Sequence, residues 1–169
     1  MTGFYQDGPQ LENQYHDDGL LRSFLDRVLE GKARKEVEND LARFADRLLG
    51  DVGEMAADAE AHPPELVQFD AWGRRIDHIE TARGWQELER VSAEEGLVAI
   101  GYDRKLGSAS RVHQFAKLYL FNPSSAVFSC PLAMEDGEAR LIEVLGDEEL
   151  KQNALAHVTR SEAEEFWSL

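Results

Sequence analysis

Apolar side chains recur at intervals of three and four residues along most of this chain, and this spacing constrains its fold more than any other feature. The longest stripe of this kind runs up to His62-Pro63-Pro64 and consists of Val37, Leu41, Phe44, Leu48, Val52, Met55 and Ala59. Because this spacing places side chains on one face of an α-helix, it predicts one long amphipathic helix. Gly50 and Gly53 each cost about 1 kcal/mol inside a helix, and a bend is expected near Gly50.

The same periodicity predicts further helices on both sides of that segment. Asp17 or Asp18 can cap a helix over about 20–30, which Gly31 ends. Helical spacing returns over about 85–96, 108–122, 125–145 and 148–157. The apolar run 97–101 is too short to assign, and the turn-like segment 69–73 is followed by at most one short strand or hairpin near 74–82. The predicted fold class is all-α, a bundle of five to seven helices.

The charge balance argues against several classes of partner. The chain has 18 Lys and Arg against 33 Asp and Glu, a net charge of −15. This charge repels phosphate backbones and anionic lipid heads, so no nucleic acid and no membrane partner is expected. Cys130 is the only cysteine, which rules out a disulfide within the chain. The N-terminus lacks the basic start and apolar run of a signal peptide, so a cytoplasmic location is expected.

Residues 118–134 contain no charged side chain. Asn122, Pro123, Pro131 and three serines make this stretch a poor membrane span, which needs about 20 apolar residues. Two interpretations remain open: the stretch is the buried centre of the domain alone, or it is also the wall of an apolar chamber. Pro131 is expected to kink a helix, which would serve either arrangement.

Several reactive side chains have structural explanations that we prefer. Cys130 with His113 has the composition of a nucleophile and its base, but apolar neighbours disfavour a reactive thiolate, so a buried structural cysteine is expected. No metal site is expected, because the candidate ligands lack the i, i+4 spacing of a helical site; these are His62, Asp70, Asp77 and His78.

Charged clusters have similar explanations. A local basic group could contact CoA phosphates or an acidic partner, although solvated helix charge is the preferred interpretation; it consists of Arg104, Lys105, Arg111, His113 and Lys117. Carboxylates that are neighbours in sequence, such as Glu94 with Glu95 or Glu164 with Glu165, point in different directions on a helix. These are interpreted as groups that aid solubility, and no catalytic residue is expected.

Four segments occur in an order that is typical of one enzyme family. They are Pro63-Pro64-Glu65-Leu66, Phe69-Asp70-Ala71-Trp72-Gly73-Arg74-Arg75-Ile76-Asp77, Gly84-Trp85 and Ser129-Cys130-Pro131-Leu132-Ala133-Met134. Together they resemble the N-terminal helical domain of acyl-CoA dehydrogenases, in the adaptive-response, AidB-like branch. The resemblance covers nearly the whole chain, from Asn13 to Trp167.

This resemblance implies an oxidoreductase of fatty acid metabolism, in which a carboxylate removes the α proton of an acyl-CoA while FAD takes a hydride. In the family, the helical N-terminal domain precedes a β-rich middle domain and a C-terminal four-helix bundle, and the flavin lies between those two. The domains expected here are an extended segment 1–17, a helical domain 18–161 and a truncated start of the middle domain at 162–169. The flavin segment and the catalytic base are expected to be missing, so no cofactor is expected for this chain alone.

The resemblance also implies that an acyl-chamber wall includes Phe128, Cys130, Pro131, Leu132 and Met134. One departure weakens this implication, because Glu135 and Glu138 stand where related chains tend to carry Thr and Ala. Burying an unpaired carboxylate is costly, so both are expected on a solvated face.

Two functions from different classes follow. In the first, the chain is the N-terminal portion of an acyl-CoA dehydrogenase-like flavoprotein, inactive without the middle and C-terminal domains. In the second, it is a non-catalytic helical module that associates with a full-length relative or another protein, as a homo- or hetero-oligomer. Both functions predict exposed apolar side chains, because large apolar patches on a monomer usually mark an interface.

Overall fold

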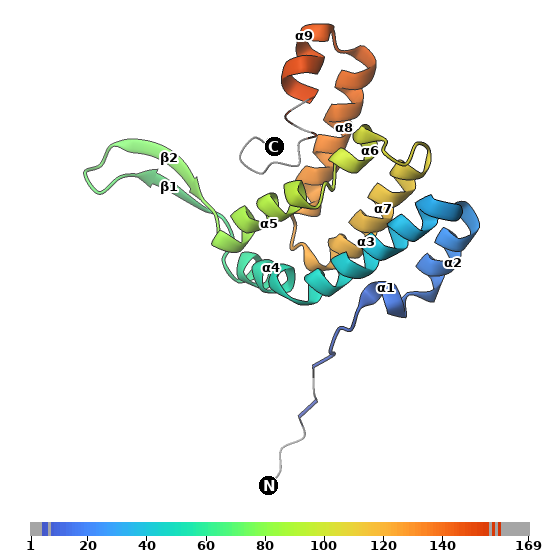
Figure 1. The fold of residues 1–169 in the computed structure, drawn as a ribbon. Helices are drawn as coiled ribbons and strands as arrows, with labels where there is room; N and C mark the ends of the chain where they lie inside the picture. The colour runs from blue at the N-terminus through green and yellow to red at the C-terminus, as the bar shows by residue number, and fades with distance from the viewer. Residues whose placement is uncertain (1–4, 7, 156, 158, 160–169) are drawn as a thin grey trace.

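Six helices of ten residues or more build the bundle in the computed structural model, which describes residues 5, 6, 8–155, 157 and 159. They are α2 (Gly19–Val28), α3 (Gly31–Leu49), α4 (Asp51–Ala61), α5 (Arg83–Glu94), α7 (Ala109–Phe121) and α8 (Ser129–Leu145). The shorter elements are α1 (Gln14–Asp17), α6 (Ala99–Asp103), α9 (Glu148–Leu150), the 3-10 turn η1 (Asn122–Ser124) and the π-helical turn η2 (Lys151–Leu155). The described residues confirm the all-α class with one short hairpin (Figure 1).

The longest apolar stripe is divided between two helices. Its residues up to Leu48 lie on α3, and Val52 follows on α4; both side chains are buried. Between them Gly50 has φ −96° and ψ −117°, which is outside the helical region, so the chain breaks where a bend was expected. The prediction of one long helix is therefore wrong, although the spacing identified residues that face the core.

The N-terminal segment is fixed to the bundle at Asn13. Its side-chain oxygen accepts from the backbone amide of His16 and caps α1, which forms the last four residues of the segment expected to be extended. The Asn13 amide donates to the backbone oxygen of Ala42 at 3.1 Å and to Asp46 Oδ1 at 2.6 Å, both on α3. Tyr15 of α1 is also buried, so α1 packs against α3.

Strands β1 (Glu65–Phe69) and β2 (Arg75–Glu80) form an antiparallel hairpin that projects from the helices (Figure 1). In its register Leu66 pairs with Ile79, and the ladder shifts between Val67 and Phe69. Asp70 closes the turn, because its Oδ1 accepts from the backbone amides of Trp72 and Arg74, each at 2.9 Å. The strand or hairpin expected near 74–82 is confirmed, and it includes a preceding strand that the sequence analysis did not assign.

Close packing holds α4, α5 and the start of α8 together. A Cβ atom on Gly84 of α5 would lie 2.1 Å from the backbone oxygen of Met55 on α4, so only glycine permits this approach. The Gly84 amide also donates to Asp58 Oδ2 at 2.7 Å. Next to it, the ring of Trp85 packs edge-on against Phe128, with ring centroids 5.0 Å apart. This contact anchors the N-terminal end of α8 in the core.

Candidate functional site

The segment at the start of α8 carries the five residues expected to wall an acyl chamber, and the structure divides them between two sides. Phe128, Pro131 and Leu132 are buried in the core. Cys130 and Met134 face outward, and the exposed fraction of the Met134 side chain is 56%. The interpretation as core alone accounts for the first three residues. Contact of Cys130 and Met134 with an acyl chain remains a prediction.

Two expectations about this segment are wrong. Cys130 is exposed and is not a buried structural cysteine, because Phe128 and Leu132 take the inward positions of this turn. Pro131 is the third residue of α8, where backbone amides have no partner within the helix. The proline therefore removes no helical hydrogen bond, and the expected kink is not required.

The two extra carboxylates of α8 are not both on a solvated face, as we had expected. Glu135 is completely buried, whereas Glu138 is half-buried. Glu135 follows Leu132 by three residues and precedes Ala139 by four, and both of these side chains are buried. The helical period therefore places Glu135 on the inward face.

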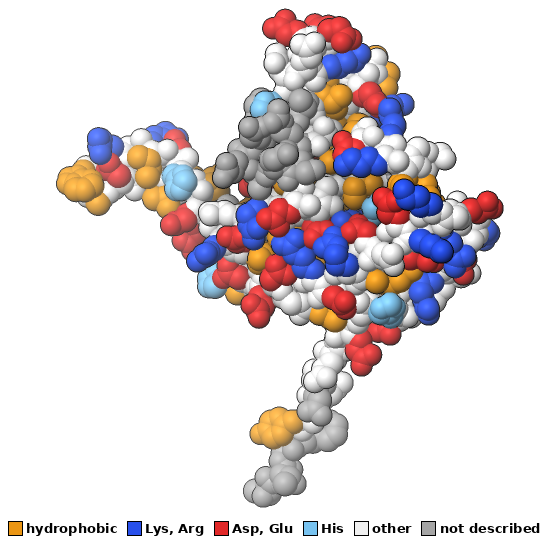
Figure 2. Space-filling view, in the orientation of Figure 1, with side chains coloured by type: hydrophobic (Ala, Val, Ile, Leu, Met, Phe, Trp, Pro, Cys, Tyr) orange, Lys and Arg blue, Asp and Glu red, His pale blue; other side chains and the backbone are white. Residues whose placement is uncertain are grey.

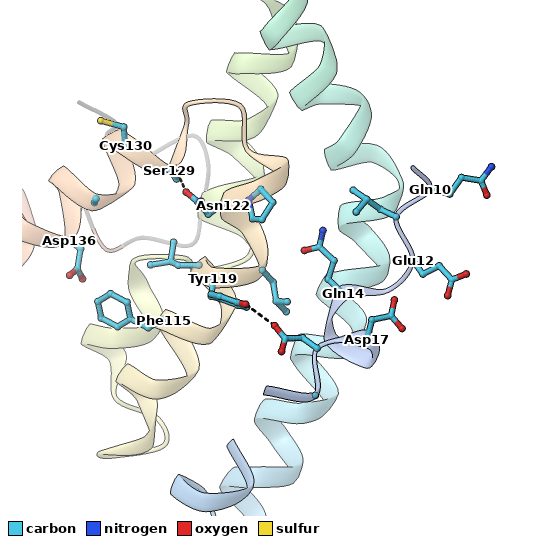
Figure 3. A pocket seen from close by; sticks show the side chains of 17 residues that line it. Gln10, Glu12, Gln14, Asp17, Phe115, Tyr119, Asn122, Ser129, Cys130 and Asp136 are labelled. Carbon is cyan, nitrogen blue, oxygen red and sulfur yellow. Dashed lines mark hydrogen bonds between the residues drawn. The ribbon is translucent and has the colours of Figure 1, made fainter. Parts of the chain in front are cut away.

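A groove of about 1430 Å³ lies between the N-terminal segment, α7 and the start of α8. Figure 3 shows Phe115 and Tyr119 of α7 below Cys130 of α8, with Glu12 of the N-terminal segment on the right. The groove is largely apolar, and its apolar lining includes Leu11, Phe115, Leu118, Leu120 and Pro123. The Tyr119 hydroxyl donates to Asp18 Oδ2 at 2.7 Å, so α7 and the start of α2 are linked across the groove.

The charged residues that line this groove are acidic: Glu12, Asp17, Asp18 and Asp136. The backbone amide of Leu21 and the Tyr119 hydroxyl lower the pKa of Asp18, and the same hydroxyl bond raises the pKa of Tyr119. None of the described lining residues is Lys or Arg, the residues that bind phosphate. The described lining is therefore apolar with an acidic rim.

An ionic cluster with a buried centre, here called the buried ionic cluster, joins α3, the end of α5 and α7, and the sequence analysis missed it. It consists of Asp40, Arg43, Arg47, Glu95, His113 and Lys117. The Arg43 side chain at its edge is 55% exposed. Lys117 Nζ lies 2.8 Å from both Asp40 Oδ2 and Glu95 Oε2, and it donates to the backbone oxygen of Glu95 at 2.9 Å. The Lys117 side chain is only 3% exposed. The interpretation of Glu95 as a group that aids solubility is therefore wrong.

The carboxylates of this cluster are held in their charged form. Burial raises the pKa of Glu95, but Arg43, Lys117 and Arg47 outweigh that effect and lower the pKa to about 2. Burial also raises the pKa of Asp40, and bonds from His113 and Lys117 hold it well below its usual range. Because these carboxylates are engaged by cations, the cluster stabilises the packing of three segments and is a poor source of a free acid or base.

The basic group predicted between 104 and 117 is not one patch. Arg104, Lys105 and Arg111 form ion pairs with Glu143, Asp103 and Asp136, at 2.6, 3.0 and 2.6 Å. His113 and Lys117 belong to the buried ionic cluster, so solvated helix charge is the wrong interpretation for these two. All five basic side chains therefore already have a carboxylate partner.

The other candidate sites find no support among the described residues. His113 Nε2 lies 2.8 Å from Asp40 Oδ2, and no hydrogen bond joins His113 to Cys130. No group of three His, Cys, Asp or Glu in this part of the chain has the arrangement of a metal site. The described helices are also too short or too polar to cross a membrane.

The class of protein that emerges is an all-α domain with an acid-rimmed apolar groove along α7 and α8. The chain belongs to the family of the adaptive response protein AidB N-terminal domain, whose model matches residues 9–163. The family resemblance that four short segments indicated is thus confirmed.

Known relatives are considerably longer than this chain. Acyl-CoA dehydrogenase family member 11 of Caenorhabditis elegans is 36% identical over 170 residues, which cover 98% of this chain and 28% of that protein. The solved structure of Bd2924 in its apo form is 49% identical with a TM-score of 0.93, over 98% of this chain and 33% of that chain. Caenorhabditis elegans ACDH-11 in complex with C11-CoA is 36% identical with a TM-score of 0.93, over 99% of this chain and 29% of that chain. The chain therefore spans about a third or less of the length of these relatives.

Proposed function

We propose that this chain is the N-terminal helical domain of an acyl-CoA dehydrogenase-like flavoprotein and supplies one wall of the acyl chamber. The observation that carries the proposal is the outward position of Cys130 and Met134 at the start of α8, with Cys130 lining an apolar groove. A relative that is 36% identical has been solved with C11-CoA, a ligand with an acyl chain. Burial of an acyl chain against such a wall would contribute about 25 cal/mol per Å² of apolar area removed from water.

The groove also indicates which part of an acyl-CoA this domain would contact. Its acidic rim and its lack of cations among the described lining residues suit the acyl chain and disfavour the CoA phosphates. In this proposal, phosphate recognition and the FAD that accepts the hydride belong to the middle and C-terminal domains of the longer family members. The role of the N-terminal domain is to exclude water and to position the chain.

A chimera tests the proposal. The region of ACDH-11 that matches this chain would be replaced by this chain, and turnover of C11-CoA would be measured by bleaching of the bound flavin. We expect flavin to bind and C11-CoA to be oxidised. Met134→Asp should lower kcat/KM for C11-CoA at least tenfold, and lower it less for a four-carbon acyl-CoA, because only the longer chain reaches the wall.

The matched control is Leu20→Asp on α2, where the leucine is apolar and highly exposed but lies on a different helix from the proposed wall. This variant should leave turnover unchanged. A chimera that binds flavin but does not oxidise C11-CoA would contradict the proposal, as would a Met134→Asp effect that is the same for both chain lengths.

The alternative function is a non-catalytic module that binds a full-length relative. The exposed apolar side chains of the hairpin favour it, namely Leu66, Phe69, Trp72, Ile76 and Ile79 (Figure 2). In this case the intact chain should form a stable complex with full-length ACDH-11, detected as an added mass in sedimentation. Trp72→Ala should weaken that complex, and a mixture that sediments as two separate species would contradict this function.

A further inference from the structure

The two sides of the groove differ in polarity. On the side formed by α8, the lining residues are Ser129, Cys130, Ala133 and Asp136. The Ser129 hydroxyl and the Asp136 carboxylate both have hydrogen-bond partners within the chain. The side formed by the N-terminal segment, α1 and the N-cap of α2 is more polar, and its polar lining residues are Gln10, Glu12, Gln14, Asp17 and Asp18. An acyl chain along α8 would therefore meet apolar surface first and carboxylates at the other side, where covering a charged group is costly.

A hydrogen bond joins the polar side to α7. The Tyr119 hydroxyl donates to Asp18 Oδ2 at 2.7 Å, and a dashed line in Figure 3 marks this bond, here called the bridge. The other carboxylate oxygen of Asp18 accepts from the backbone amide of Leu21 at 2.8 Å and caps α2. Because both oxygens of Asp18 have a donor, the carboxylate is fixed, and it holds the Tyr119 ring in place.

We propose that the bridge sets the upper limit of acyl-chain length in this groove. This inference rests on the proposed function and adds two specificity-determining residues, Tyr119 and Asp18, to it. A chain that passes Cys130 crosses the ring of Phe115, and its methyl end stops at Tyr119. A longer chain has to break the bridge or cover the Asp18 carboxylate, and either change leaves a charged group with too few hydrogen bonds.

The bridge should make the limit sharp. Each methylene up to Tyr119 is removed from water against apolar lining, which favours binding. The next methylene gains little and disrupts the hydrogen bonds of Asp18. In the chimera described above, kcat/KM should therefore rise with chain length between four and sixteen carbons, reach an optimum and then fall. A single methylene changes such a preference by about tenfold or more.

Asp18→Ser tests the limit without removing the helix cap. Serine also caps helices, so α2 is retained while the carboxylate and the bridge are lost. The optimum should move to longer chains, and the ratio of kcat/KM for the sixteen-carbon substrate to that for C11-CoA should rise about tenfold. The matched control is Asp147→Ser, because Asp147 caps α9 through the amide of Leu150, also at 2.8 Å, and does not line the groove. This control should leave the ratio unchanged.

Two substitutions of Tyr119 separate the bridge from general packing. Tyr119→Phe removes only the hydroxyl and should also move the optimum to longer chains. Combined with Asp18→Ser it should add little, because the two changes break the same bond. Tyr119→Trp enlarges the side chain at the proposed stop and should move the optimum to shorter chains. Fully additive shifts for the first two substitutions would show that the bridge is not the determinant.

Photolabelling locates the chain end without turnover. An acyl-CoA of the optimal length with a diazirine at its methyl end would be irradiated in the flavin-bound chimera, and the labelled peptides identified by mass spectrometry. We expect label on the peptides that contain Tyr119 or Asp18. Label only outside these peptides would overturn the inference.

The outcomes distinguish this inference from the proposed function. A chimera that oxidises C11-CoA, but keeps its chain-length profile in Asp18→Ser, overturns the role of the bridge and leaves the proposed function intact. A flavin-bound chimera that does not oxidise C11-CoA contradicts the proposed function, and the inference falls with it.

Discussion

The buried ionic cluster and the β1–β2 hairpin both contain ion pairs, yet they are stabilised in opposite ways. Lys117 has its partners on α3 and at the end of α5, 77 and 22 residues away in sequence. The side-chain hydrogen bonds of the hairpin are short-range, such as those that the backbone amides of Trp72 and Arg74 donate to Asp70. Figure 2 shows the apolar side chains of the hairpin at the surface, and Trp72 is 84% exposed.

The buried ionic cluster contributes to the cooperative stability of the whole helical domain, whereas the stability of the hairpin is local. Loss of a group in the buried ionic cluster affects three segments at once, because an unpaired charge inside the core is costly. A two-stranded hairpin without a covering layer is marginally stable in water, so the hairpin can open while the helices stay folded. Substitutions in the two regions should therefore change the free energy of unfolding by different amounts. Different measurements should also be needed to detect their effects.

The largest effect is expected for Lys117→Met. Removal of the ammonium group leaves the Asp40 and Glu95 carboxylates close together without their central cation, which should lower the free energy of unfolding by about 3–5 kcal/mol. Urea unfolding measures this loss. Lys105→Met is the matched control, because Lys105 is 80% exposed and forms a surface ion pair, and it should change stability by less than about 0.5 kcal/mol. Equal losses in the two variants would contradict the central role of Lys117.

Acid should destabilise the chain through the same cluster. The pKa of Glu95 is about 2 in the folded chain and 4.5 when unperturbed, so its contribution is complete above pH 4.5 and disappears as the pH falls towards 2. That difference corresponds to about 3 kcal/mol, and Asp40 acts in the same direction. Unfolding curves between pH 5 and 2 measure the loss. Glu95→Gln should be less stable at pH 7, and its free energy of unfolding should decline less steeply as the pH falls. An unchanged decline would show that other groups cause the acid sensitivity.

Hairpin substitutions should have little effect on global stability. Ile79→Ala removes a side chain that is 61% exposed, so the free energy of unfolding should change by less than about 0.5 kcal/mol. Leu88→Ala in α5 provides the contrast, because Leu88 is completely buried and should cost about 2–5 kcal/mol. The two variants are compared in one set of urea titrations. A loss above about 1 kcal/mol for Ile79→Ala would mean that the hairpin folds cooperatively with the helices.

The smallest global effect is expected for Asp70→Ala. The carboxylate closes only the hairpin turn, and backbone amide bonds lower its pKa. The substitution should leave the thermal midpoint unchanged while amide hydrogen exchange becomes faster at Trp72 and Arg74. Unchanged exchange at these two amides would show that the turn does not depend on Asp70.

Two side chains that are neighbours in the sequence can have different environments in the structure. Glu94 and Glu95 are adjacent carboxylates, yet Glu94 remains partly exposed beside Arg47 while Glu95 enters the cluster. Nothing near them in sequence distinguishes the two, because the deciding partners lie on α3 and α7. For Cys130 the prediction failed in the opposite direction. Its uncharged neighbours in the sequence suggested burial, but its side chain lies on the exposed face of the helix.

The sequence by itself determined the helices, the hairpin position and the family, because periodicity and short motifs depend on residues that are close in the chain. Only the tertiary structure decided which face of α8 meets the core, where α3 ends and α4 begins, and which charges become buried. The physical reason is that burial and ion pairing depend on the approach of distant segments, as in the contact between Asp40 and Lys117. The α8 sequence contains two apolar lines, and packing against the core selects the one that is buried.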